Sequence, residues 1–314
     1  MYKVRKFEYS DAPNFFNDFK RFFPTFEITE ETFLRKTFIN PDFDMDGVFY
    51  LLKDDEKVGF AYAQVKRVQV DVGDDVEKSQ GNIVFIKVSD DDAYPVGANL
   101  LIDAVENFVK SKGKTSITAC GGTCYFEPGL DIINDKKMIE VFIERGYEHG
   151  QCIAQRIDLT TYEKPEKLVQ KHEELTKQGF YIGPLTWELY LQFLSEQIFA
   201  RPGWVAQFRK RVLFAPTDLE RVIVAAKDGK ILGGVIFGDP DSTPGRFGPF
   251  GVDRNYQGNG LGSVMLMLCL SEMKKRGIES SYMQSSSPIG AAFTVYNRAG
   301  FKEYARYETM QKKL

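Results

Sequence analysis

One stretch near the C-terminus decides the fold: Phe247-Gly248-Pro249-Phe250-Gly251-Val252-Asp253-Arg254-Asn255-Tyr256-Gln257-Gly258-Asn259-Gly260-Leu261-Gly262-Ser263. The pattern is typical of a strand, a turn with glycine at every second position, and a helix that extends to Lys275. Because glycine has no Cβ, the backbone N–H groups of such a turn can face one concavity, and the helix N-terminus adds partial positive charge there. The stretch therefore predicts a phosphate-binding turn. The alternative is a tight strand-to-helix turn that needs glycine only for its own geometry.

Two common nucleotide-binding motifs do not match. A dinucleotide fingerprint, G-x-G-x-x-G, requires glycine at Ser263 when it is counted from Gly258, and no βαβ crossover with a ribose-binding acid follows. A P-loop requires Gly-Lys-Ser/Thr, which Gly113-Lys114-Thr115 supplies, but the earlier glycine of that motif falls on Phe108 and the triplet ends a helix. The expected ligand is therefore a different phosphate compound.

The same order of elements occurs twice along the chain. In the second half, strand patterns at 222–227, 231–237 and 247–252 precede the helix at 261–275. The first half repeats this order of three strands and a helix, at 47–53, 58–70, 82–88 and 96–110, after helical patterns at 14–23 and 30–39.

Both halves also end alike, with a helix, a stop glycine and an aromatic residue. The two stop glycines, Gly146 and Gly300, are 154 positions apart, and the turn glycines Gly97 and Gly260 are 163 apart. Two diverged copies of one mixed α/β unit explain both spacings, and two unrelated α/β domains are the alternative.

We therefore expect a mixed α/β fold in two tandem domains, 1–158 and 180–314, joined by a linker helix at 159–179. A chain of 314 residues is long enough for two hydrophobic cores. The linker is rich in Lys and Glu, contains Pro165 and ends at Gly179. This composition is typical of a solvated helix whose charges need no functional explanation.

The charge balance excludes one class of partner. Lys and Arg together number 41 against 44 Asp and Glu, so a general affinity for nucleic acid has no electrostatic basis. The N-terminus has no apolar run behind its basic residues, and no segment approaches the length of a membrane span. We expect a cytoplasmic protein, a monomer or a homodimer, with no membrane partner.

The cysteine and histidine content argues against a metal site and against a disulfide framework. The chain has four cysteines and two histidines, and His149 and His172 lack ligand spacing with a second cysteine pair. The scarcity of histidine also weakens any scheme with a histidine base beside a serine or cysteine nucleophile. We expect no metal and reduced thiols at Cys120, Cys124, Cys152 and Cys269.

The turn resembles the acetyl-coenzyme A motif Q/R-x-x-G-x-G/A of the GCN5-related N-acetyltransferase (GNAT) superfamily, through Gln257, Gly260 and Gly262. The stretch Ala292-Phe293-Thr294-Val295-Tyr296-Asn297-Arg298-Ala299-Gly300-Phe301 resembles the closing motif of that family, A-x-x-x-Y-x-x-x-G-F. The resemblance covers about 247–301, and the order of elements from 181 to 314 agrees with it. It implies an acyltransferase that uses acetyl-CoA.

The resemblance also implies roles for particular residues. Backbone groups of Phe250, Gly251 and Val252 are expected to pair with the pantetheine arm. The residues expected to hold the pyrophosphate are Gln257, Gly258, Asn259, Gly260, Leu261, Gly262 and Ser263.

Tyr296 is the expected catalytic residue, because the resemblance implies that it lies near the thioester sulfur. A phenol at that point can protonate the departing thiolate as a general acid. An ordinary core tyrosine is the alternative. One departure from the family is Ile289, which stands where an asparagine often contacts the cofactor; Ser285, Ser286 or Ser287 is a possible substitute.

The first half has lost these features. The corresponding turn, Tyr94-Pro95-Val96-Gly97-Ala98-Asn99, keeps one glycine and follows Asp90-Asp91-Asp92, which repels a pyrophosphate. Phe142 stands 154 positions before Tyr296 and has no proton to donate. We expect residues 1–158 to be a degenerate copy that neither binds coenzyme A nor catalyses. Its expected task is to pack against the second domain and wall the acceptor site.

The acceptor is less constrained. Tandem arrangements of this kind resemble bacterial acetyltransferases of amino sugars, aminoglycosides or thiol-containing glycosides, so the leading hypothesis is direct attack by a primary amine of a small molecule in a ternary complex. Acetylation of protein amines and a non-catalytic acyl-CoA sensor are the alternatives. The candidates for the base are Asp239, Asp241 and Glu188, and Trp204 with Arg201 is a candidate contact for the acceptor.

Overall fold

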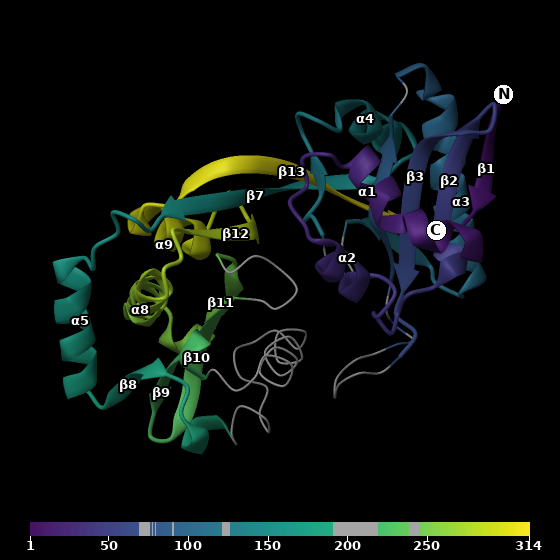
Figure 1. Cartoon of the computed structure of the whole chain (residues 1–314). Coiled ribbons are helices and arrows are strands. Elements are labelled where there is room, and N and C mark those ends of the chain that lie inside the picture. Colours follow the sequence, from purple (N-terminus) through teal and green to yellow (C-terminus); the bar gives the residue numbers. More distant parts are fainter. Residues whose placement is uncertain are drawn as a thin grey trace. The chain divides into compact units, whose positions relative to one another are not determined.

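The computed structural model describes residues 1–68, 76, 78, 80–89, 91–120, 126–190, 219–238 and 245–314, and these form two compact units (Figure 1). Unit 1 contains Met1–Val70, Asp74–Cys152 and Ala305–Leu314, and unit 2 contains Ile153–Tyr304. Each unit has its own hydrophobic core, and the mixed α/β fold expected from the sequence is confirmed.

Unit 1 is a mixed sheet with helices on both faces. Its strands pair in the order β1-β2-β3-β4-β5-β13, and only β4 and β5 are parallel. The elements of this unit are β1 (Tyr2–Lys6), α1 (Phe15–Phe22), α2 (Glu30–Lys36), β2 (Val48–Lys53), β3 (Glu56–Val65), β4 (Gly81–Val88), α3 (Val96–Ser111), β5 (Ser116–Ala119), β6 (Leu130–Asp131), α4 (Lys136–Glu144) and part of β7 (Glu148–Asp158).

The two faces of this sheet have different cores. One face packs on α3 through aliphatic side chains such as Leu101 and Val105, which have no exposed surface. The other face packs on α1 and α2 through phenylalanine rings, among them Phe15, Phe19 and Phe33. Strands β2 and β3 are buried on both faces, which explains why their sequences are continuously apolar rather than alternating.

Strand β3 is shorter than the predicted strand over 58–70. It ends at Val65, because the carboxylate of Asp42 accepts hydrogen bonds from the backbone N–H groups of Arg67 (2.7 Å) and Val68 (3.2 Å). These two amides are therefore bound to a side chain and cannot pair with a neighbouring strand.

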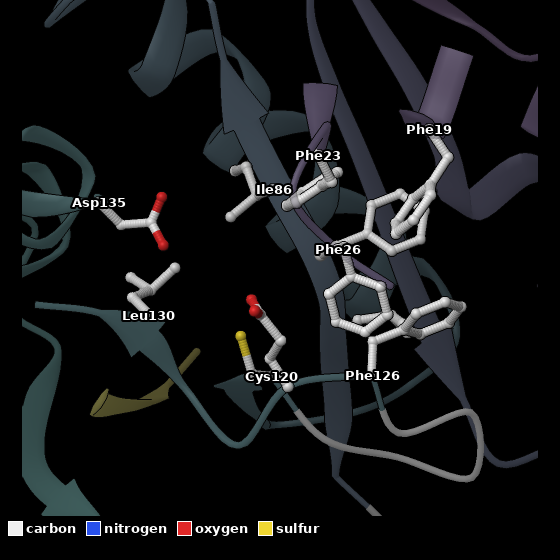
Figure 2. Close-up of a pocket in the computed structure, with 11 residues that line it drawn as sticks. Phe19, Phe23, Phe26, Ile86, Cys120, Phe126, Leu130 and Asp135 are labelled. Atoms are coloured by element: carbon white, nitrogen blue, oxygen red, sulfur yellow. The ribbon is translucent and has the colours of Figure 1, made fainter. Parts of the chain in front are cut away.

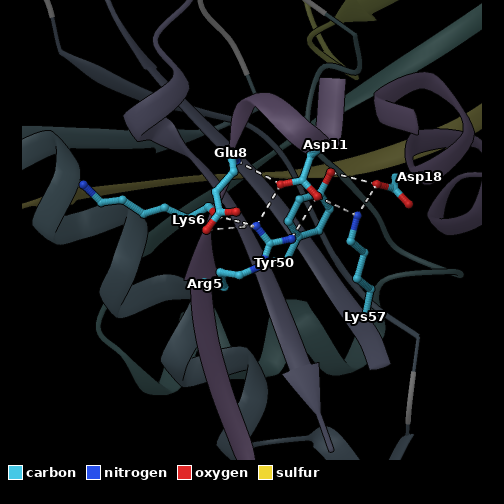
Figure 3. A network of polar contacts seen from close by, with 7 residues as sticks. All are labelled: Arg5, Lys6, Glu8, Asp11, Asp18, Tyr50 and Lys57. Atoms are coloured by element: carbon cyan, nitrogen blue, oxygen red, sulfur yellow. Dashed lines mark hydrogen bonds and ion pairs between the residues drawn. The ribbon is translucent and has the colours of Figure 1, made fainter. Parts of the chain in front are cut away.

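A network of charges attaches the N-terminal helices to the sheet (Figure 3). The buried carboxylate of Asp11 accepts hydrogen bonds from Arg5 at 2.8 and 2.9 Å and from Lys57 at 3.1 Å. Lys57 also binds Asp18 (2.7 Å), which accepts the hydroxyl hydrogen of Tyr50 (2.8 Å). Burial alone raises the pKa of Asp11, but the bonds from Arg5, Glu8 N–H and Lys57 together hold that pKa well below its usual range. Each charge in the network has a partner, so its role is structural.

Unit 2 repeats the order of unit 1. Its elements are the rest of β7, α5 (Glu166–Lys177), β8 (Phe180–Pro184), β9 (Val222–Lys227), β10 (Lys230–Phe237), β11 (Phe247–Val252), α8 (Leu261–Lys275), β12 (Ser280–Ser286), α9 (Ala291–Ala299) and the start of β13 (Lys302–Lys313). Strands β11-β10-β9-β8 form an antiparallel sheet in that order, and α8 packs on β8, β9 and β10.

Two strands carry the chain between the units. In unit 1, the end of β13 pairs antiparallel with β5, with Met310 opposite Ala119. In unit 2, the second part of β7 pairs antiparallel with β12, with Arg156 opposite Tyr282. Unit 1 thus includes the last residues of the chain, Ala305–Leu314, and unit 2 includes the end of β7 from Ile153 on. None of the described helices has the length and apolar character needed to cross a membrane.

Candidate active site

Strand β11 lies at the edge of the sheet of unit 2. It pairs with β10 from Phe247 to Val252. On its other side, the described residues pair with β12 only at a parallel bridge between Arg246 and Tyr282, at the very start of β11. Beyond that bridge, no strand of the described part of the chain pairs with residues 250–252 on their outer edge. An extended ligand can form backbone hydrogen bonds along such an edge.

The turn after β11 ends in a helix start whose first amides have no acceptor within the helix itself. Gly258 and Gly260 have left-handed backbone conformations, with φ of +82° and +89°. The N–H of Val264 donates to the carbonyl of Gly260 at 3.1 Å, and no side chain caps the helix. The three preceding helical amides have no acceptor within the helix. They belong to Leu261, Gly262 and Ser263.

The rest of the predicted turn is partly engaged within the protein. The backbone N–H of Gln257 donates to the carbonyl of Arg254 at 3.4 Å, and the side-chain amide of Gln257 donates to the carbonyl of Val252 at 3.0 Å. The side chain of Asn259 donates to the carbonyl of Tyr256 at 3.5 Å. Gln257 therefore fixes the turn to the end of β11.

The strand and the helix start lie in direct contact. A Cβ placed on Gly262 lies 3.4 Å from Phe250 Cζ and 3.5 Å from Val252 Cγ2, which are ordinary van der Waals distances, so the helix start packs directly on these two side chains of the strand. The remaining predicted strand residue, Gly251, lies close to Gly233 of β10, where an added Cβ lies 2.9 Å from the carbonyl oxygen of Gly251. A Cβ on Gly233 also lies 2.8 Å from Met265 Cε of α8, so this glycine allows β10 to fit under α8.

Tyr296 lies on α9, beside the same strand. Its ring centroid lies 6.0 Å from that of Phe250, 5.6 Å from that of Phe247 and 5.7 Å from that of Phe301. The residue is 5% exposed, and none of the described residues hydrogen-bonds its hydroxyl. Burial, with a smaller effect of the Cys269 thiol, raises the pKa of Tyr296, so the phenol keeps its proton at neutral pH.

One neighbour of the turn, Lys171, was not predicted from the sequence as a site residue. The side chain of Lys171, on helix α5, lies over Gly260: its Cε, Cγ and Cδ atoms lie 3.1, 3.3 and 3.7 Å from the position of an added Cβ there. The lysine-rich composition of the linker indicated a solvated helix and contains no signal for this contact, because the contact depends on how α5 packs against α8.

Only some of the other predicted candidates lie within the described residues. Asp239, Asp241, Arg201 and Trp204 lie outside the described residues, as does Cys124. Ile289 is 77% exposed, and its N–H donates to the hydroxyl of Ser287 at 3.3 Å. Glu188 is fully exposed, and backbone and Thr186 hydrogen bonds lower its pKa. The described residues include no cluster of three or more side chains suited to a metal ion.

The corresponding turn of unit 1 is built differently. Gly97 has no left-handed conformation, and a Cβ added to it lies 2.4 Å from Leu51 Cδ2, so this glycine serves the packing of α3 on the sheet. The side chain of Asn99 donates to the carbonyl of Pro95 at 3.0 Å. Phe142 is fully buried, with its ring 4.7 Å from that of Tyr147. The turn of unit 1 therefore lacks the left-handed glycines found in the turn of unit 2.

The space between the parallel strands of unit 1 is also filled. Strands β4 and β5 pair as far as Ile83 and Ala119, and a cavity of about 10 Å³ lies where they separate, room for about one water molecule (Figure 2). Rings such as Phe23 and Phe126 form one wall, Asp135 lies across from them, and Glu127 also lines the cavity. Burial, with the nearby carboxylates of Asp135 and Asp131, raises the pKa of Glu127 to about 8. An acyl chain does not fit there.

Known proteins share this fold over the whole chain. A GCN5-related glucosamine N-acetyltransferase region of a fungal multi-domain GH3 β-N-acetylglucosaminidase is 19% identical, with a TM-score of 0.75 over 99% of this chain. This chain spans 38% of that protein. A GCN5-related N-acetyltransferase from Sphaerobacter thermophilus is 15% identical, with a TM-score of 0.70 over 99% of this chain and 95% of that one.

A third similar structure is a tandem GNAT protein from the clavulanic acid biosynthesis pathway. It is 12% identical, with a TM-score of 0.61 over 100% of this chain and 98% of that one. No curated protein matches the sequence significantly. The family model for the acetyltransferase (GNAT) family matches residues 186–301, which include β11, the glycine turn and Tyr296. Residues 186–301 are therefore a domain of the acetyltransferase (GNAT) family, whose members transfer acetyl groups from acetyl-CoA.

Proposed function

We propose that the chain transfers an acetyl group from acetyl-CoA to a primary amine of a small molecule, with amino sugars as the leading acceptor class. The observation that carries the proposal is the meeting of three features in unit 2: a strand edge without a partner among the described residues, a helix start whose first three amides have no acceptor within the helix, and a buried phenol. The first two fit an extended pantetheine arm that ends in a pyrophosphate. The third supplies a proton donor.

Acetyl-CoA supplies an acyl group activated as a thioester. The backbone of residues 250–252 holds the arm along the edge of β11, and the amides of Leu261, Gly262 and Ser263 bind the pyrophosphate. The other residues predicted for the turn shape it, with Gln257 fixing it to the strand. Because these contacts use the backbone, they need no excess of basic side chains.

The reaction forms a C–N bond and breaks the C–S bond of the thioester. The neutral amine attacks the carbonyl carbon, and the hydroxyl of Tyr296 donates its proton to the sulfur as it leaves. The attacking nitrogen releases a proton to solvent, from which the phenol is reprotonated. The raised pKa of Tyr296 keeps the donor protonated before each turnover.

An amino sugar acceptor is supported by analogy of fold. The fungal protein whose structure resembles this one over 99% of this chain is described as a glucosamine N-acetyltransferase region. At 19% identity this similarity concerns the fold, so glucosamine is the first compound to test. Unit 1 takes no acetyl-CoA in this proposal, because its turn lacks left-handed glycines and its strand opening is filled.

The test combines calorimetry with a panel of amines. We expect one equivalent of acetyl-CoA to bind per chain, and release of the coenzyme A thiol with glucosamine or another amino sugar. Two equivalents would show that unit 1 also binds. Binding without thiol release across amino sugars, aminoglycosides, amino acids and peptides would overturn the enzymatic proposal in favour of an acyl-CoA sensor.

A further inference from the structure

The linker helix α5 lies against the helix that starts at the proposed pyrophosphate site. Its apolar side chains Leu168, Val169 and Leu175 pack into the same core as α8. Leu175 is 1% exposed, which fixes the rotation of α5 about its own axis. Lys171 stands between Leu168 and Leu175 at helical spacing, one helical turn before Leu175.

This packing places the stem of Lys171 across Gly260. Three carbons of the stem lie within 3.7 Å of the position of a Cβ on Gly260, and the ammonium nitrogen is one bond beyond the nearest of them, Cε at 3.1 Å. Gly260 stands in the middle of the run of backbone amides from 257 to 263. A cation at this point lies beside that run.

The charge of Lys171 is only partly neutralised in the protein. Among the described residues, its ion-pair partner is Glu174 on the same helix, at 3.1 Å. Glu174 is 60% exposed, so this ion pair contributes little and is easily exchanged. The side chain of Lys171 is 35% exposed, so the ammonium is accessible to a ligand.

We propose that Lys171 contacts the pyrophosphate of acetyl-CoA, so that the linker helix completes the phosphate site begun by α8. This inference rests on the proposed function and adds one charged side chain to a site otherwise built from backbone. An ammonium beside a phosphate forms a charge-assisted hydrogen bond, which is stronger than one between neutral groups. Since Lys171 lies outside 186–301, the site extends beyond the segment that matches the family model.

The test is calorimetry of acetyl-CoA binding to the full chain and to three variants. Lys171→Met keeps the apolar stem over Gly260 and removes the charge, Lys171→Arg keeps the charge, and Lys177→Met is the matched control on an exposed position of the same helix. We expect Lys171→Met to raise the Kd about tenfold, as loss of one charge-assisted bond predicts. Lys171→Arg is expected to restore most of the affinity, and Lys177→Met to bind as the unaltered chain does.

A second ligand separates the phosphates of the cofactor. 3′-Dephospho-coenzyme A keeps the pyrophosphate, so Lys171→Met is expected to lose the same factor of about ten with it. The factor by which Lys171→Met weakens binding is also expected to fall as the salt concentration rises, because salt screens the charge. A purely structural effect does not depend on salt in this way.

Three results would overturn the inference in different ways. Unchanged affinity of Lys171→Met would show that the lysine only packs over Gly260. A loss that disappears with 3′-dephospho-coenzyme A would assign the lysine to the 3′-phosphate instead. Failure of the unaltered chain to bind acetyl-CoA would remove the proposed function itself, whereas the first two results leave it standing.

Discussion

The ring of Phe250 lies 6.0 Å from the ring of Tyr296, centroid to centroid, and so joins the strand edge to the phenol. On its other side, the tip of the same ring lies 3.4 Å from the position of a Cβ on Gly262, at the start of α8. One side chain therefore sets the spacing between the proposed proton donor and the proposed pyrophosphate site. The distance between these two groups must match the length of the pantetheine arm.

Tyr296→Phe is expected to lower kcat about 100-fold and to leave the Kd of acetyl-CoA unchanged. The phenylalanine keeps the ring packing against Phe250 and Phe247 and removes only the proton donor, a loss typical of general acid catalysis. The measurement is steady-state thiol release together with calorimetry. Tyr256→Phe, a half-buried tyrosine of the same unit, is the control and should retain activity. Full activity of Tyr296→Phe would mean that water protonates the thiolate.

Gly258→Ala is expected to weaken acetyl-CoA binding, and Gly277→Ala is its matched control. Both glycines have left-handed conformations, with φ of +82° and +77°, and an added Cβ meets no atom within 4 Å at either position. Each substitution should therefore cost about 1 to 2 kcal/mol of stability from backbone strain. Only Gly258 lies in the proposed phosphate-binding turn, so only Gly258→Ala should raise the Kd of acetyl-CoA in calorimetry. Equal binding by both variants would show that the turn needs glycine for its geometry alone.

The parts of the site that depend on neighbouring residues in the chain could be predicted from the sequence. The glycines at alternate positions favour the left-handed conformations of Gly258 and Gly260. The helical pattern after them predicts first-turn amides with no acceptor within the helix. The strands and helices that flank the turn follow the apolar periodicity and are confirmed, including α8 over Leu261–Lys275.

The remaining features depend on contacts between distant segments. The approach of Lys171 to Gly260 follows from the packing of two helices, and the filling of the unit 1 cavity by Phe19, Phe23 and Phe126 joins residues about 100 positions apart. The early end of β3 is set by the carboxylate of Asp42. No local periodicity encodes such contacts, because each depends on which elements become neighbours in space.

The stability of unit 1 is expected to fall as the pH rises from about 5 to 8 because of Glu127. Its pKa is about 8 in the folded chain and near the ordinary 4.5 when unfolded, so between these values the folded state holds more protons and stability declines with pH. Glu127→Gln should remove this dependence and stabilise unit 1 at pH 8 by about 1 to 3 kcal/mol. Hydrogen exchange of β4 and β5 at pH 5.5 and 8 measures it.

The exposed Glu140 on α4 supplies the control for that experiment, since Glu140→Gln should leave the exchange unchanged at both pH values. Both tryptophans of the chain, at positions 187 and 204, fall within unit 2, so their fluorescence reports separately on that unit. Identical pH dependence of the Glu127→Gln variant and the unaltered chain would contradict the prediction.

Lys312→Met is expected to destabilise unit 1, although the residue stands at the end of the second half of the sequence. Strand β13 brings Lys312 to within 3.1 Å of the Glu106 carboxylate on α3, which Arg145 also binds at 3.1 Å. Glu106 is 5% exposed; burial alone raises its pKa, but Lys312 and Arg145 reverse this and lower the pKa. Removing one cation from a buried carboxylate should lower the stability of unit 1 by about 1 to 3 kcal/mol above pH 5. The effect should be smaller as Glu106 becomes protonated below its unfolded pKa of 4.5.

Hydrogen exchange in Lys312→Met should therefore speed up in α3 and β5 but not in α8. Lys313→Met, on the exposed next position, is the control and should change exchange in neither region. Faster exchange confined to α8 would show that the end of β13 stabilises unit 2 instead.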